Sequence, residues 1–98
     1  MKSKKHGGVV IDHSRQLPRL RRIEGQVRGL QQMIENGRGC TEILDQISAA
    51  VAALRRVQGD MLRDHLIACA LAIAEGGVTE KEARQLAEEV GTLLSRLG

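Results

Sequence analysis

The sequence predicts an all-α protein, and three observations support this fold class. Phe, Tyr and Trp are absent, so the apolar residues are mainly Leu, Ile, Val, Ala and Met. Such residues suit the seams between helices better than they suit sheets. From residue 17 onward the apolar positions recur at steps of three and four, the spacing of one helix face. No stretch alternates as a strand does. We therefore expect three helices and no strands.

The first expected helix follows a polar N-terminal arm. Residues 1–13 contain Gly7-Gly8 and lack a helical period, so we expect a flexible basic arm before a single domain over residues 14–98. Ser14 is the expected N-cap of the helix, and Pro18 fits its first turn, where a missing N–H has no partner to lose. The apolar face of this helix consists of Leu20, Ile23, Val27, Leu30 and Ile34.

The second expected helix is much longer than the first. It begins near Cys40 and continues to Gly76-Gly77, a length of roughly 50 Å at 1.5 Å per residue. A capping box at residues 79–82 then opens a short third helix. A chain of 98 residues cannot bury so long a rod by itself, so we expect the long helix to pair antiparallel with its copy in a dimer.

Two cysteines and one histidine are the candidate metal ligands. His65 and Cys69 are four residues apart and therefore share one face of the long helix, although a core histidine and a buried cysteine are the commoner roles of such residues. Cys40 lies 25 residues before His65, about 37 Å away along one straight helix. In an antiparallel dimer, Cys40 of one subunit would approach the pair of the other. The alternative is a break at Gly59 that folds the long helix into a hairpin within one chain.

Two thiolates and one imidazole favour a soft ion, and a set of three ligands suits trigonal Cu(I). Zn²⁺ would need a further ligand such as water, and Ni²⁺ could recruit a nitrogen of His6 or His13 from the arm. The metal-free alternative is a sensor in which Cys40 and Cys69 react with oxidants or persulfides.

Basic residues are concentrated near the N-terminus. Residues 1–28 hold eight Lys and Arg against two acidic residues, whereas the remainder holds seven against ten. This asymmetry indicates a polyanionic partner, with a solvated basic face as the alternative. Because aromatic side chains are absent, stacking on single strands is disfavoured, and duplex DNA read partly through its shape is expected. The basic clusters are Arg19, Arg21 and Arg22 in the first helix and Arg55-Arg56 in the second.

Several protein classes are excluded by what the sequence lacks. It has no glycine-rich phosphate loop, nucleophile elbow or helical His-Glu-x-x-His motif, so we do not expect an enzyme. No run approaches the roughly 18 apolar residues of a membrane span, and Met1–Ser14 has no apolar core of a secretory signal. We expect a cytoplasmic protein with reduced thiols. A cytosolic metal buffer or helical interaction module that does not bind DNA is the alternative from another class.

Three stretches resemble the CsoR/RcnR/FrmR family of metal-sensing repressors, and in particular its copper-sensing CsoR-type branch. They are Arg21–Gly29, Cys40–Ala49 and Asp64–Cys69, and the resemblance covers roughly residues 14–95. It implies three-helix protomers in a disc-like tetramer, a dimer of dimers with Cu(I) bound between subunits. It also implies that the metal-free form binds operator DNA and that the metal-bound form releases it.

The resemblance assigns roles to individual residues. It implies that Cys40, His65 and Cys69 bind the metal. Gly39 stands where copper sensors often have Tyr, and in an ungapped register Gln85 stands where a Glu often supports the coordinating His. We expect Gln85 to take that supporting role.

Arg19 and Arg56 match positions associated with DNA binding in the family, and the charge pattern adds Arg22 and Arg55. Relatives with other ligand sets sense persulfide, nickel, cobalt or formaldehyde. The presence of His65 argues against a pure thiol sensor, and the presence of Cys69 argues against the formaldehyde and usual nickel–cobalt patterns.

Overall fold

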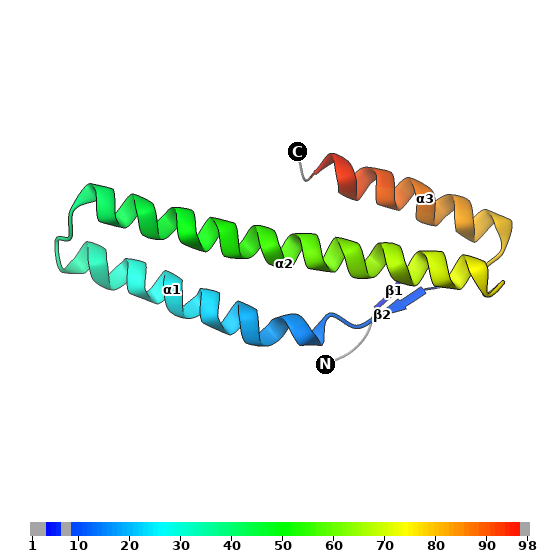
Figure 1. Cartoon of the computed structure of the whole chain (residues 1–98), viewed down its shortest axis with the longest axis horizontal. Coiled ribbons are helices and arrows are strands. Elements are labelled where there is room, and N and C mark those ends of the chain that lie inside the picture. The colour runs from blue at the N-terminus through cyan, green and yellow to red at the C-terminus, as the bar shows by residue number, and fades with distance from the viewer. Residues whose placement is uncertain (1–3, 7–8, 97–98) are drawn as a thin grey trace. The chain divides into compact units, whose positions relative to one another are not determined.

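The computed structural model describes residues 4–6 and 9–96, and it describes their side chains from residue 11 onward. Its long elements are three helices, which confirm the all-α class (Figure 1). The elements in chain order are β1 (Lys4–His6), β2 (Val9–Ile11), the 3₁₀ helix η1 (Ser14–Gln16), α1 (Leu17–Glu35), α2 (Cys40–Ala74) and α3 (Glu80–Ser95).

The N-terminal segment differs from the sequence prediction. Strands β1 and β2 pair antiparallel, with Lys4 opposite Ile11 and His6 opposite Val9, so the expectation of no strands is wrong here. Consecutive β-branched residues at positions 9–11 favour extended backbone. The dipeptide Gly7-Gly8 between the two strand segments is itself a hairpin signal in the sequence. The rest of the expected arm, residues 1–3 and 7–8, lies outside the described residues.

The chain divides into two compact units, and residues 14–59 form one of them. Within this unit α1 runs antiparallel to the first part of α2 (Figure 1), and Ile23, Ala50 and Val57 are buried. Pro18 lies in the first turn of α1 as predicted. The expected cap at Ser14 is not found, because η1 precedes the helix and Gln16 is the N-cap residue, without a side-chain cap hydrogen bond.

Helix α2 is one continuous helix of 35 residues. It continues through Gly59, so the alternative of a hairpin broken at that residue is wrong. It ends where predicted, since Gly76 has a φ of +69°, a left-handed conformation that glycine adopts without steric cost. The N–H of Gly77 then donates to the carbonyl of Ala72 at 2.9 Å and caps the last turn.

The second unit comprises residues 1–13 and 60–98. In it α3 runs back along the last part of α2 (Figure 1). The predicted capping box is present: the Thr79 hydroxyl accepts from the N–H of Glu82 at 3.1 Å, and the Glu82 carboxylate accepts from the N–H of Thr79 at 3.0 Å. The core of this unit is small and consists of Ile11, Cys69 and Leu86, with Ala68, Ala72 and Val78 packed against it.

The single chain leaves many large apolar side chains exposed. Along α2 alone these are Leu44, Ile47, Val51, Leu54, Leu66, Ile67, Leu71 and Ile73, each at least 40% exposed. Apolar surface on this scale marks an interaction surface in a soluble protein. None of the helices in the described part of the chain is long and apolar enough to cross a membrane.

Candidate metal centre

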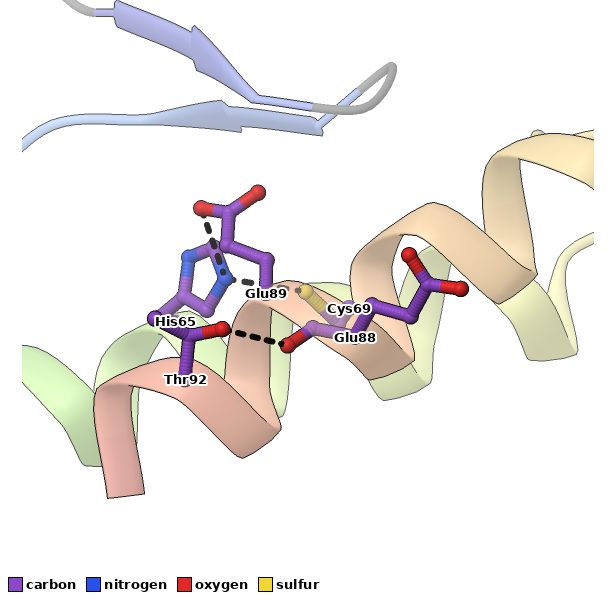
Figure 2. Close-up of polar contacts among 5 residues, drawn as sticks. All are labelled: His65, Cys69, Glu88, Glu89 and Thr92. Carbon is purple, nitrogen blue, oxygen red and sulfur yellow. Dashed lines mark hydrogen bonds and ion pairs between the residues drawn. The ribbon is translucent and has the colours of Figure 1, made fainter. Parts of the chain in front are cut away.

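His65 and Cys69 lie together on the last part of α2. The separation between Nε2 of His65 and Sγ of Cys69 is 3.6 Å (Figure 2). Their positions four residues apart place both side chains on one face of the helix. Both are buried, at 5% and 6% exposure, since this face is covered by α3 and by Ile11. The structure therefore brings together a thiol and an imidazole in a site largely closed to water.

Helix α3 contributes a carboxylate to the same site. Oε1 of Glu89 lies 3.6 Å from the same Nε2 of His65, and the Glu89 side chain is one-third exposed. Figure 2 shows the imidazole between the sulfur of Cys69 and this carboxylate. The neighbouring Glu88 extends away from the imidazole, and its backbone carbonyl accepts a hydrogen bond from Thr92. Glu89 is thus the acidic residue of α3 that faces the candidate site.

The sequence prediction placed Gln85 in this position, and the structure differs. Gln85 is exposed, whereas Leu86 is almost fully buried at 1% exposure. Glu89 lies three residues after Leu86 and four after Gln85, so helix spacing alone places it near both. What distinguishes Glu89 is the 3.6 Å separation between its Oε1 and Nε2 of His65. The contact between α3 and His65 that identifies Glu89 joins two separate helices and has no signal in the sequence. An ungapped register with the family could not reveal it.

The environment of the site acts on the acidity of its thiol. Burial, and secondly the negative charge of Glu89, raise the pKa of Cys69 above its ordinary value. The folded protein therefore favours the neutral thiol. A metal ion binds the thiolate, so ligation by Cys69 must release a proton to solvent.

The spacing of the two donors fits a single metal ion. For bonds of about 2.3 Å to sulfur and about 2.0–2.1 Å to nitrogen, donors at tetrahedral or trigonal angles lie about 3.5–3.8 Å apart. The observed separation of 3.6 Å falls in this range. A thiolate and an imidazole are ligands that soft or borderline ions such as Cu(I) and Zn²⁺ accept. The pair can therefore serve as two ligands of one ion without rearrangement of α2.

The third predicted ligand is not part of this cluster. Cys40 is the first residue of α2 and is an exposed free cysteine. Among the described residues no three His, Cys, Asp or Glu side chains are grouped to hold a metal ion. His13 is partly exposed, and its Nδ1 atom is buried without a hydrogen-bond partner. His6 lies in β1, and its side chain is outside the described residues.

The predicted DNA-binding arginines lie in the unit formed by residues 14–59. Arg22 on α1 and both Arg55 and Arg56 on α2 are exposed, and Arg19 is partly buried. The structure therefore presents guanidinium groups on both helices of this unit, as contact with phosphates requires.

A helical chain with a buried thiol–imidazole pair and exposed arginines has the donor atoms of a metal site and the basic surface of a protein that contacts polyanions. The model of the metal-sensitive transcriptional repressor family matches residues 12–96. The chain belongs to this family.

Individual relatives are similar over differing lengths. The copper-sensing transcriptional repressor RicR of Mycobacterium tuberculosis is 53% identical over 60 residues, which are 60% of this chain and 62% of RicR. The chain thus spans less than two-thirds of that relative's length. The Cu(I)-bound copper-sensing repressor CsoR of Geobacillus thermodenitrificans has a TM-score of 0.78 and 38% identity, over 95% of this chain and 97% of CsoR. The nickel-responsive regulator InrS has a TM-score of 0.74 and 33% identity, over 90% of this chain and 94% of InrS.

Proposed function

We propose that this protein is a copper-responsive transcriptional repressor of the cytoplasm, which binds operator DNA in its metal-free form and releases it on binding Cu(I). The observation that carries the proposal is the buried pair of His65 and Cys69, whose donor atoms lie 3.6 Å apart, in a chain of the metal-sensitive repressor family. The likeness to the copper sensors RicR and CsoR supports Cu(I) as the ion.

In this proposal Cys40 of a second subunit completes the site. Trigonal Cu(I) takes three soft ligands, and within one chain Cys40 is not grouped with the pair. Two features support ligation across a subunit boundary: Cys40 is exposed, and α2 carries a row of exposed apolar side chains that a second α2 would cover. An antiparallel pair of long helices, assembled further as a dimer of dimers, would give equivalent sites on both subunits.

Glu89 is the residue that we propose to support His65. A carboxylate supports a ligating imidazole by accepting from the ring nitrogen that does not bind the metal, which fixes the tautomer and orientation of the ring. Oε1 of Glu89 lies 3.6 Å from Nε2, the same atom that lies 3.6 Å from Sγ of Cys69, so in this proposal the imidazole turns on metal binding, with one nitrogen on the ion and the N–H of the other donating to Glu89. Because Glu89 belongs to α3, such a change would transmit metal binding from α2 to a second helix.

We assign DNA binding to Arg19, Arg22, Arg55 and Arg56. Release of DNA on metal binding requires that the ion bind more tightly to the form of the protein that has low affinity for DNA. By reciprocity, DNA then weakens metal binding by the same factor. A coupling of about 3 kcal/mol lowers DNA affinity by roughly a hundredfold. Since α2 contains all three proposed ligands and two of the arginines, it is the element that we expect to link the two activities.

Nickel is the second candidate inducer. It is favoured by the likeness to the nickel-responsive InrS and by the unpartnered Nδ1 atom of His13, which offers a further nitrogen donor. Nickel accepts imidazole ligands in square-planar or tetragonal sites. Under this alternative His13→Ala would weaken Ni²⁺ binding while leaving Cu(I) binding unchanged.

The test is an anaerobic titration of the reduced protein, bound to fluorescent DNA from its own promoter, with Cu(I) against a competing chelator. We expect stoichiometric binding that releases the DNA. His65→Ala should abolish release but retain DNA binding, whereas the matched variant His13→Ala should behave as wild type with Cu(I). DNA binding that Cu(I) leaves unchanged would refute copper as the inducer.

DNA binding is tested separately through its salt dependence. Arg55→Ala and Arg56→Ala should weaken binding, and each should lower the slope of log affinity against log salt by about one unit per phosphate that its guanidinium neutralises. Arg84→Ala is the control, because Arg84 is an exposed arginine on α3, paired with Glu80 at 3.2 Å. Equal salt slopes for the Arg55, Arg56 and Arg84 variants would show that α2 is not part of the DNA interface.

A further inference from the structure

Ile11, the last residue of β2, is buried against the candidate metal ligand Cys69. Ile11 is 5% exposed and belongs to one cluster with Cys69 and Leu86. Asp12 is exposed and His13 is only partly buried. Among the side chains of residues 11–13, Ile11 is therefore the one that belongs to the apolar cluster.

The strands β1 and β2 lie on one particular side of the candidate metal site. Figure 2 shows β1 and β2 on the side of the site toward which the carboxylate of Glu89 points. The other residues packed against the cluster are Ala68, Ala72 and Val78, all small or medium in size. Ile11 and Leu86 are therefore the large apolar side chains that cover Cys69, beside the imidazole of His65.

We propose that Ile11 is a cover for the thiol of Cys69, and that it must leave its place before Cys69 can bind a soft metal ion or react with a thiol reagent. The statement about metal rests on the function proposed above, whereas the statement about thiol reagents does not. Ile11 is in this sense a positioning residue, because it acts on the site by controlling access to Cys69.

The two large neighbours of Cys69 differ in how readily they can move. Leu86 belongs to a helix of 16 residues that starts with a capping box. Ile11 belongs to a strand of three residues whose pairing partner β1 also has three. A two-stranded hairpin is marginally stable by itself, so local opening of this segment requires far less free energy than unfolding of α3. The cover is thus the part of the cluster that can open first.

Metal binding at Cys69 and the packing of Ile11 in the cluster with Cys69 should oppose each other. A metal ion bound to Sγ of Cys69 needs space beside a sulfur that is buried in one cluster with Ile11. If the cover must open for the ion to bind, removing the cover strengthens metal binding. By reciprocity the ion then displaces Ile11 and with it the segment that carries Lys4 and Lys5.

The first experiment measures the alkylation of each cysteine by iodoacetamide in the metal-free, reduced full-length protein, with mass spectrometry to resolve the two sites. The sulfur displaces iodide, forms an S–C bond and gives its proton to solvent. Exposed Cys40 is an internal reference in the same molecule. Ile11→Ala should raise the alkylation rate at Cys69 by about tenfold relative to the rate at Cys40. A tenfold change corresponds to only part of the free energy gained by burying an isoleucine side chain. Ile11→Val should stay close to wild type.

The matched control is Ile23→Ala. Ile23 has the same exposure of 5% but lies in the unit of residues 14–59, so its truncation loosens the protein without uncovering Cys69. An unchanged ratio of the Cys69 rate to the Cys40 rate in Ile11→Ala would overturn the proposal. A ratio raised equally by Ile23→Ala would also overturn it, since general loosening would then explain the effect.

The second experiment adds Cu(I) in competition with a chelator. Ile11→Ala should bind Cu(I) about tenfold more tightly than wild type, the same factor by which the cover limits access. Weaker binding would show that Ile11 closes over the bound ion instead of opposing it, and would overturn this half of the proposal. If the wild type does not bind Cu(I), the proposed function fails, while the alkylation result still decides whether Ile11 covers Cys69.

Discussion

Glu89→Gln should accelerate the reaction of Cys69 with a thiol reagent near neutral pH. The Glu89 charge is one of the two causes that raise the pKa of Cys69, after burial. Nε2 of His65 lies 3.6 Å from Sγ of Cys69 and 3.6 Å from Oε1 of Glu89, so the two charges are at most about 7 Å apart. At that distance like charges repel by about 0.6 kcal/mol in water and about 2.4 kcal/mol at an effective dielectric constant of 20.

The Glu89 side chain is 33% exposed, which places the repulsion near the aqueous end of this range. Removing it should therefore raise the fraction of Cys69 thiolate, and the alkylation rate, by about three- to tenfold at a pH below the thiol pKa. The assay is the alkylation rate at Cys69, followed as a function of pH and divided by the rate at Cys40. Glu88→Gln is the control, because Glu88 extends away from the site (Figure 2). Equal pH profiles for the two variants, or a slower reaction in Glu89→Gln, would refute this account of the site's electrostatics.

Three further predictions concern stability and metal affinity. Leu86→Ala should lower the free energy of unfolding by about 3 kcal/mol in urea titrations, because Leu86 is 1% exposed and core truncations of this kind cost about 2–5 kcal/mol. The control Leu94→Ala, at a residue that is 51% exposed, should lower it far less at the same protein concentration. Thr79→Ala should cost about 1 kcal/mol through loss of the capping box, and Thr92→Ala, whose hydroxyl bonds a carbonyl within α3, should cost less. Because the raised pKa keeps Cys69 protonated near neutral pH, Cu(I) affinity should rise as pH increases, by up to about tenfold per unit for each thiol proton that the ion displaces. Affinity independent of pH would exclude Cys69 as a ligand.

The helices could be predicted from the sequence because their signals are local. The steps of three and four, Pro18 in the first turn of α1 and the capping box at Thr79 each follow from the conformations of a few neighbouring residues. The positive φ at Gly76 is local in the same way. The pairing of β1 with β2 was missed because strands of three residues are too short to display an alternating pattern.

The site was only partly predictable because it depends on contacts between segments. His65 and Cys69 are four residues apart on one helix, so the period alone places them together. Glu89 reaches them from α3 and Ile11 from β2, and neither approach follows from spacing along the chain. Within α3, Gln85 and Glu89 are four residues apart and share a face, so the choice between them is settled only by the contact of Glu89 with His65.

Subunit complementation tests whether Cys40 of one subunit completes the His65–Cys69 site of another. Cys40→Ser and Cys69→Ser homo-oligomers each lack a ligand at every site and should bind Cu(I) weakly. In a mixed antiparallel dimer, one site combines Cys40 of the Cys69→Ser subunit with the intact pair of the Cys40→Ser subunit. The account predicts that refolding the two variants together restores tight Cu(I) binding at one site per mixed dimer. Mixed oligomers that bind Cu(I) no better than the separate variants would contradict it.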